Sequence, residues 1–427
     1  MMRPLLLIAL LCAALPARAE SVLSLEEALQ NAQSRQPQLR QAQAETEAAR
    51  ARADQRKASL LPQVNASASY QRSTSGSTGT DTVDPGTTSP RGSGFSVGAT
   101  ASQLLYDFGQ TSGRWRSSQS SAEAQASSAE QTQLEVQANV RTAYFSVLAQ
   151  QSLVQVAKET LQNEETHLRQ VQAQVEVGTR PEIDLLQQRT SLANARLQLI
   201  QAQTTYATSK AQLNQAMGLE GATDYTVQEV TTAAVEGEEQ PLDTLVDSAL
   251  TNRPDLAASA AQLRAQELQL TATRRGYWPS LSAAVNGSDS GTNLSQTQWN
   301  LTGQLVLSWP LFQGGITRAQ VREQEATLTS LQAQRDTLRQ QVRLEVERAQ
   351  LSVHSSRESL AAAEEALANA RERLRLAEGR YTAGVGNIIE LGDAQVQATN
   401  AASQRVQAEY QIATARTELA RALGRQL

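Results

Sequence analysis

VGTRPEIDLLQQRTSLANARLQLIQAQTTYATSKAQLNQAM, residues 177–217, is the stretch that decides the fold. After a turn that contains a glycine and a proline, apolar side chains recur once every seven residues, at Leu185, Leu192, Leu199, Tyr206 and Leu213. Three residues after each of these stand Gln188, Ala195, Ala202, Ser209 and Ala216. A strict seven-residue repeat keeps one seam against a partner helix and imposes a left-handed supercoil. The stretch therefore predicts the returning arm of a helical hairpin.

The outgoing arm, which runs from Thr111 to the turn at 178–181, is predicted to be one helix. At about 1.5 Å per residue it would be roughly 100 Å long, too long for one compact domain. The same hairpin occurs a second time, because adding 206 to a position carries Gly178 onto Gly384 and Leu213 onto Leu419. The second seam consists of Leu391, Ala398, Arg405, Ile412 and Leu419, followed three residues later by Ala394, Ala401, Ala408, Ala415 and Ala422. The chain is therefore predicted to be a rod or a wall built from two repeats.

Each repeat also has a shorter opening helix. Residues 24–60 begin with Ser24 and Glu27, a capping-box spacing, and only Pro37 interrupts the helical pattern. At an offset of 217, Pro37 falls on Pro254, which predicts a second opening helix over about 241–276.

Between the opening helix and the hairpin, each repeat changes to a period of two. Apolar residues alternate with polar ones over about 63–72, 94–104, 280–287 and 298–308, which predicts four half-buried strands. Loops rich in Gly, Ser, Thr and Asp join the strands in pairs, at 73–93 and 288–297. We therefore divide the chain into a first repeat, 20–218, and a second repeat, 241–427, joined by a linker, 219–240, that we expect to form an irregular collar.

The first 19 residues predict a secretory signal peptide, with an apolar run from Leu5 to Leu15 and Ala17-Arg18-Ala19 before Glu20. Cys12, the only cysteine, would be removed with it, so no disulfide is expected. The formal net charge is −5, and loss of Arg3 and Arg18 would make it −7, which argues against a nucleic-acid partner.

Strands of about ten residues with one apolar face, in an exported chain, are typical of a transmembrane β-barrel. Four strands cannot close such a barrel, and an open sheet edge is not tolerated in lipid. The smallest usual barrel has about eight strands, so two or more chains must contribute. Three chains would supply twelve strands, although hydrogen bonding alone does not select three.

At this point the chain resembles the TolC-type outer membrane factor family of Gram-negative bacteria. The resemblance covers both repeats and includes Leu311-Phe312-Gln313-Gly314-Gly315 and its weaker twin Leu105-Tyr106-Asp107-Phe108-Gly109 at the exits from strand to helix. It implies a membrane α+β fold, in which a homotrimer forms a twelve-stranded transmembrane β-barrel continued by a long periplasmic α-helical barrel. It also implies a location in the outer membrane lipid, a periplasmic adaptor (membrane fusion) protein and an inner membrane pump of RND or ABC type as partners.

The resemblance further implies a gate at the periplasmic tips of the hairpins. Tyr381 matches a latch tyrosine, Glu390 and Asp393 match two acidic ring positions, and Asp184 matches the acidic partner on the first hairpin. The family's latch arginine corresponds to Gly386, and Arg180 is the residue that could replace it. The tips themselves are expected to dock the adaptor, through Val177, Gly178, Thr179, Ala383, Gly384 and Val385.

The leading functional hypothesis is a passive exit duct of a tripartite efflux system. Two alternatives are the outer membrane channel of a type I protein secretion system and, from another class, a coiled-coil stalk or adhesin. An enzyme is not expected, because His167 and His354 are the only histidines and no phosphate-binding loop is present. No cofactor and no metal site are predicted.

Overall fold

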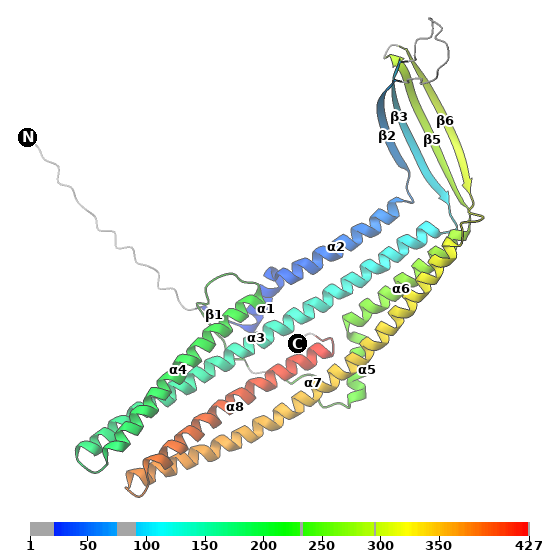
Figure 1. Ribbon diagram of the computed structural model, residues 1–427. Helices are drawn as coiled ribbons and strands as arrows, with labels where there is room; N and C mark the ends of the chain where they lie inside the picture. The colour runs from blue at the N-terminus through cyan, green and yellow to red at the C-terminus, as the bar shows by residue number, and fades with distance from the viewer. Residues whose placement is uncertain (1–20, 75–90, 231–233, 294–295, 426–427) are drawn as a thin grey trace, which may run out of the picture.

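The computed structural model describes residues 21–74, 91–230, 234–293 and 296–425. The predicted signal peptide and most of the first strand-connecting loop lie outside these ranges. A four-stranded sheet forms one end of an elongated molecule, and two long helical hairpins extend from it to the opposite end (Figure 1). Within the described residues, none of the helices combines the length and apolar character needed to cross a membrane.

Two helices form each hairpin. The first hairpin consists of α3 (Gln110–Glu176) and α4 (Glu182–Met217), and the second of α7 (Ile316–Thr382) and α8 (Ile388–Ala422). Both outgoing helices have 67 residues, which corresponds to about 100 Å. The predicted heptad seams face inward: Leu192, Leu213, Leu391 and Leu419 are buried in the isolated chain.

The opening segments are each broken into two helices. In the first repeat these are α1 (Leu25–Arg35) and α2 (Pro37–Ala58), and in the second α5 (Leu242–Asn252) and α6 (Pro254–Arg274), which continues into a short 3-10 turn, η1 (Arg275–Tyr277). Both breaks occur at a proline, which lacks an N–H and therefore starts a new helix at its first position. The capping box at Ser24 and Glu27 is present at the start of α1.

A glycine packs against each of these breaks. Gly218, just after α4, has φ +70°, and a Cβ there would lie 2.7 Å from the Cα of Gln36. Gly424, just after α8, has φ +69°, and its Cβ would lie 3.0 Å from the Cα of Arg253. The returning helix of each hairpin therefore ends against the break in the opening helix of the same repeat, as the internal repeat requires.

The sheet contains β2 (Gln63–Thr74), β3 (Arg91–Tyr106), β5 (Ser280–Asn293) and β6 (Gln296–Ser308), antiparallel and in the order β2-β3-β5-β6. β3 and β5 extend beyond the predicted ranges, because polar and glycine residues near the loops continue the ladder. Aligned partners such as Ala66, Ala99, Gly287 and Leu301 share one face. This face carries exposed apolar side chains, including Val64, Val97, Val285, Trp299, Leu301 and Leu305.

The linker is more ordered than the predicted irregular collar. Residues of β4 (Tyr225–Val227) pair in parallel with β1 (Ser21–Leu23), so the linker and the start of the described chain form one small sheet. Tyr144 of α3 donates its hydroxyl to the carbonyls of Leu23 and Gln228, at 3.0 and 2.7 Å. This sheet is thereby attached to the middle of the first hairpin.

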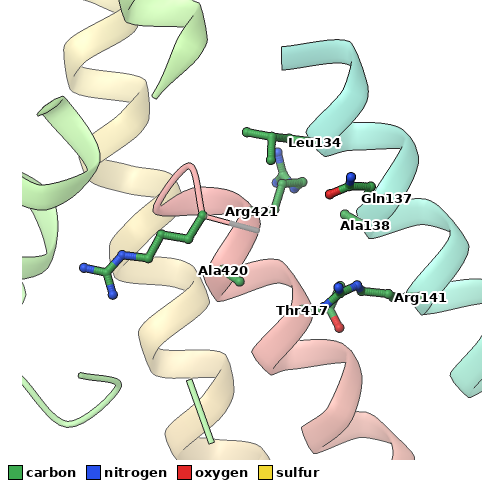
Figure 2. A pocket seen from close by; sticks show the side chains of 8 residues that line it. Leu134, Gln137, Ala138, Arg141, Thr417, Ala420 and Arg421 are labelled. Carbon is green, nitrogen blue, oxygen red and sulfur yellow. The ribbon is translucent and has the colours of Figure 1, made fainter. Parts of the chain in front are cut away.

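Two apolar clusters hold the middle of the rod together. One is centred on Val140, Tyr144 and Leu213 in the first repeat, and the other on Val346, Leu245 and Leu419 in the second. Between α3 and α8 at this level lies a hollow of about 10 Å³, where Arg141 of α3 points toward Thr417 of α8 (Figure 2). A space of that size holds about one water molecule, so it is a packing defect and not a ligand site.

Candidate functional site: the hairpin tips

The two tips are short loops with matching geometry. α3 and α4 are joined by residues 177–181, and α7 and α8 by 383–387. Gly178 and Gly384 have φ of +76° and +78°. Glycine and, to a lesser extent, asparagine adopt this left-handed conformation at the end of a helix with little strain. The N–H of Thr179 donates to the carbonyl of Gln174, and that of Val385 to the carbonyl of Arg380. Both outgoing helices are therefore closed by the same backbone motif.

The predicted docking residues form an exposed, partly apolar end to the molecule. Val177 is 74% exposed and Val385 is 72% exposed, and nothing lies within 4 Å of a Cβ added at Gly178 or Gly384. Thr179 and Ala383 are exposed as well. The ends of both hairpins are therefore accessible and present one large apolar side chain each.

The two tips are joined by a contact between Arg180 and Tyr381. The guanidinium of Arg180, from the first hairpin, lies 4.2 Å from the ring centroid of Tyr381, at the end of α7. Its Nη2 donates to the Tyr381 carbonyl at 2.7 Å, and its Nη1 to the carbonyl of Gly386 at 3.5 Å. Arg180, and not a residue at position 386, thus supplies the arginine that contacts Tyr381 between the hairpins.

Asp184 completes this group from the first turn of α4. The Tyr381 hydroxyl donates to Asp184 Oδ2 at 3.5 Å, and both side chains are buried. Burial and the Asp184 charge raise the pKa of Tyr381, while the Arg180 charge opposes the rise. The hydroxyl therefore stays protonated at neutral pH and remains a donor. We name Arg180, Asp184 and Tyr381 the tip lock.

Gly386 cannot carry an arginine in this geometry without adjustment. A Cβ at this position would lie 3.0 Å from the backbone N of Tyr381 and 3.1 Å from the carbonyl carbon of Arg380. The segment around Gly386 is closely packed, and the guanidinium that contacts Tyr381 comes from Arg180 on the other hairpin. The sequence named Arg180 only as a substitute, since its distance from Tyr381 depends on how the hairpins meet.

Glu390 and Asp393 lie on the first turns of α8 and take no part in the tip lock. Glu390 Oε1 forms an ion pair with Nε of Arg380, at 3.4 Å, and the Glu390 N–H is capped by Asn387 Oδ1 at 2.7 Å. Asp393 is exposed. These two carboxylates are three residues apart and so share one helix face, as predicted.

A buried polar pair above the tips was missed at the level of sequence. Glu164 of α3 is 6% exposed, and its Oε2 accepts from Nε2 of Gln188 on α4 at 2.5 Å. Burial raises the pKa of Glu164, against the hydrogen bond from Gln188 and the charge of His167. The sequence feature that indicated this pair is Gln188, which stands in a seam of otherwise small residues. A long polar side chain in a buried seam requires a hydrogen-bond partner.

Within the described ranges, no three His, Cys, Asp or Glu residues lie close enough together to hold a metal ion. The tips bring together side chains from both hairpins through Arg180 and Tyr381, and their turns are exposed.

A sequence model described as outer membrane efflux protein matches residues 28–219 and 245–425, which is most of the chain and includes both repeats. The chain belongs to this family. Family membership confirms the resemblance and the outer membrane location that the sequence predicted. The family and the relatives described below are named for transport across the outer membrane.

Curated relatives share about a quarter of their residues with the chain. The pyoverdine export outer membrane protein OpmQ of Pseudomonas putida is 25% identical over 410 residues, covering 94% of this chain and 85% of the relative. OpmQ of Pseudomonas aeruginosa is 26% identical over 280 residues, which spans 62% of this chain and 56% of that relative. The toluene efflux pump outer membrane protein TtgC of Pseudomonas putida is 26% identical, over 69% of this chain and 61% of its own length.

Solved structures show the same fold. The CmeC outer membrane channel of Campylobacter jejuni superposes with a TM-score of 0.80 at 21% identity, covering 94% of this chain and 85% of that chain. The outer membrane protein VceC of Vibrio cholerae gives a TM-score of 0.80 at 17% identity, over 94% and 96% of the two chains. Membership of the efflux protein family favours a channel over the stalk or adhesin.

Proposed function

We propose that this efflux protein family member is the exit duct of a tripartite system, which passively conducts substrates across the periplasm and the outer membrane. The observation that carries the proposal is the joining of a four-stranded sheet, apolar on one face and open at both edges, to two hairpins of about 100 Å. The first repeat, 20–218, and the second, 241–427, would each supply one strand pair and one hairpin to the wall of the duct, with the linker 219–240 at its waist.

The open edges support a shared barrel. β2 pairs only with β3, and β6 only with β5, among the described strands. Each therefore has one edge of unpaired backbone groups, which lipid cannot satisfy. Three copies, joined β6 to β2, would close twelve strands into a barrel with the apolar face outward, and would place the helices in a continuous ring below it.

The tips support a gate and a docking site. The tip lock joins the two hairpins of one chain, so breaking it would free the second hairpin to move away from the first. Glu390 and Asp393, repeated by symmetry, would place carboxylates around the narrow end of the duct and favour cations there. The exposed turns around Gly178 and Gly384 would meet the periplasmic adaptor, which links the duct to an inner membrane pump of RND or ABC type.

Small molecules are the cargo that we propose. Relatives are named for the export of pyoverdine, for toluene efflux and for antibiotic efflux, all of which concern compounds and not proteins. These names favour efflux over type I protein secretion for this chain.

Two measurements test the proposal together. The purified protein, reconstituted in a planar bilayer, should produce discrete conductance steps, which a stalk or adhesin would not produce. Deletion of the gene should increase sensitivity to antibiotics, solvents or detergents without loss of secreted proteins. Absence of conductance from a correctly inserted oligomer would contradict the duct, and loss of one secreted protein without altered sensitivity would point to type I secretion.

A further inference from the structure

A groove lies beneath the sheet, between α2 and α6 and over α3. It has a volume of about 810 Å³ and is lined by charged, hydroxyl and amide side chains. α2 contributes Arg52 and Arg56, Ser59 follows the end of α2, and α3 contributes Ser118, Ser121 and Gln125. No carboxylate lines it. We call it the basic groove.

Helical spacing aligns three arginines along the basic groove. Arg52 and Arg56 are four residues apart and so share one face of α2. Arg114 precedes Ser118 by four residues and so lies on the groove-lining face of α3, one turn nearer the sheet. α2 runs toward the sheet and α3 away from it, and Lys57 Nζ lies 5.7 Å from the centre of the Trp115 ring. That contact places the C-terminal end of α2, which carries Arg56, beside the N-terminal end of α3, which carries Arg114.

These arginines have no ionic partner in the part of the chain that the structure describes. Arg52, Arg56 and Arg114 are exposed, and none of them forms an ion pair there. Glu45, seven residues before Arg52 on the same face of α2, already accepts from Nε2 of Gln125 at 3.1 Å and from Nε2 of Gln41 at 2.9 Å. The lining of the groove thus contains two arginines and no carboxylate, in a chain whose net charge is −5.

The internal repeat shows that packing does not require these charges. At the offset of 217, Arg52 and Arg56 correspond to Gln269 and Thr273, and at the offset of 206 Arg114 corresponds to Gln320. Helices α6 and α7 pack together in the second repeat without any of the three arginines. The arginines therefore need another explanation than helix packing.

Depth relative to the sheet suggests what the groove contacts. Arg56 comes seven residues before the start of β2, and Arg114 four residues after the start of α3. At about 1.5 Å per residue both lie within roughly 10 Å of the base of the sheet. That base carries the exposed aromatic residues Tyr106, Trp278 and Trp309, a composition typical of the membrane–water boundary. The groove is thus at the depth of lipid phosphates on the periplasmic side.

We propose that the basic groove binds a phosphate-bearing anion, with the headgroup of an anionic phospholipid of the inner leaflet as its occupant. Arginine presents a planar fork of donors that matches phosphate oxygens, and the serine hydroxyls and the Gln125 amide lie beside it. The site is separate from the tips and from conduction, and it rests on the part of the proposed function that places the sheet in the outer membrane and the helices in the periplasm.

The test measures binding to the full-length oligomer in detergent by native mass spectrometry. The probes are dioleoyl phosphatidylglycerol, dioleoyl phosphatidylcholine and soluble glycerol 3-phosphate. We expect preferential retention of phosphatidylglycerol. Each of Arg52→Gln, Arg56→Gln and Arg114→Gln should weaken it roughly five-fold, and the triple variant roughly a hundredfold.

The control is the triple variant Arg116→Gln, Arg318→Gln and Arg322→Gln. It removes the same charge from exposed arginines near the sheet that lie off the groove-lining faces of α2 and α3, and it should bind the lipid as the native protein does. Glycerol 3-phosphate binding that is lost only in the groove variant would identify a free phosphate as the occupant. Equal losses in both triple variants, or no preference for phosphatidylglycerol together with no glycerol 3-phosphate binding, would overturn the proposal. Size-exclusion profiles establish that each variant is a folded oligomer.

Discussion

Tyr381 joins two hairpins through both its ring and its backbone carbonyl. Arg180 stacks on the ring at 4.2 Å and donates to the carbonyl at 2.7 Å, whereas the hydroxyl reaches Asp184 only at 3.5 Å. A hydrogen bond and a cation–π contact each contribute about 1 kcal/mol. The contacts of Arg180 with Tyr381 are therefore stronger than the contact of Asp184 with Tyr381. The hydroxyl contact, at the long limit of a hydrogen bond, contributes less.

Arg180→Ala should therefore raise the resting conductance more than Tyr381→Phe. A loss of roughly 2 kcal/mol shifts an opening equilibrium about thirty-fold, while the tyrosine change should produce less than about a three-fold effect. Single-channel recordings provide the measurement. Arg189→Ala, an exposed arginine of α4, is the matched control. If Arg180→Ala leaves the closed level unchanged, the lock does not hold the mouth shut.

Glu164 predicts a pH dependence of stability. Burial raises its pKa above the usual 4.5, so the folded protein takes up this proton at a higher pH than the unfolded chain does. The free energy of unfolding of the wild type should therefore increase relative to that of Glu164→Gln when the pH is lowered. The increase should occur between the raised pKa of Glu164 in the folded protein and 4.5. At neutral pH the glutamine variant should be more stable by about 1 kcal/mol, because no charge is then buried.

Thermal unfolding of the two proteins at pH 7.5 and pH 5 measures this difference. Glu159→Gln, on the same helix but exposed, should leave the pH dependence as it is in the native protein. A gap between wild type and Glu164→Gln that stays constant over this range would show that Glu164 is already neutral or well solvated.

At the scale of elements, the sheet derives its two faces from cross-strand alignment. Gly287 of β5 aligns with Ala99 on one side and with Leu301 on the other, and the neighbouring Ser288 aligns with Gly98 and Asn300. Each strand thus presents its apolar residues on the same side. A single-residue shift in register would turn every apolar side chain to the polar face.

Leu301→Arg should cost about 2–4 kcal/mol if this position lies near the middle of the bilayer, while Asn300→Arg should be tolerated. Val97→Arg and Ser96→Arg form a second matched pair on β3. The yield of heat-resistant oligomer in mild detergent measures each effect. Equal damage from both members of a pair would show that the apolar face does not contact lipid.

The tip turns allow a test that separates backbone strain from contact with a partner. Gly178→Val and Gly384→Val place a β-branched residue at φ near +77°, which strains the turn, and they should abolish efflux while the oligomer yield stays normal. Asparagine tolerates this conformation but still adds a side chain. Gly178→Asn and Gly384→Asn should therefore keep the turn and weaken cross-linking to the adaptor. Efflux that survives both valine variants would exclude the tips as the docking site.

At the scale of the whole molecule, an oligomer would repeat the tip carboxylates of Glu390 and Asp393 once for each chain. Glu390 is partly offset by Arg380, whereas Asp393 is exposed and forms no ion pair among the described residues. Asp393 would therefore be the stronger contributor to the carboxylate ring that we propose for the oligomer. Such a ring attracts divalent cations.

Addition of divalent cations from the periplasmic side should lower the conductance. Glu390→Gln combined with Asp393→Asn should remove this block and reduce the selectivity for cations, with most of the effect from Asp393→Asn alone. Titration of single-channel current with Mg²⁺ or Co²⁺ measures it. A block of the same strength in the double variant would place the constriction elsewhere.

Local, repeating features of the chain could be deduced from the sequence. The heptads of 185–216 and 391–422, the alternation in the strands and the glycines at 178 and 384 each depend on the geometry of one element. The offset of 206 then related the two hairpins without knowledge of their packing. The splitting of the opening helices follows from Pro37 and Pro254, the only interruptions in those segments that lack an N–H.

Contacts between distant elements were decided only by the tertiary structure. Arg180 and Tyr381 are 201 residues apart, and whether they meet depends on the register and supercoil of two hairpins, which no local pattern encodes. The pairing of Glu164 with Gln188 and the alignment of Arg56 with Arg114 likewise arise because antiparallel helices bring particular turns together. Sequence periodicity determined which face of each element is buried, and packing determined which side chains on the remaining faces lie next to one another.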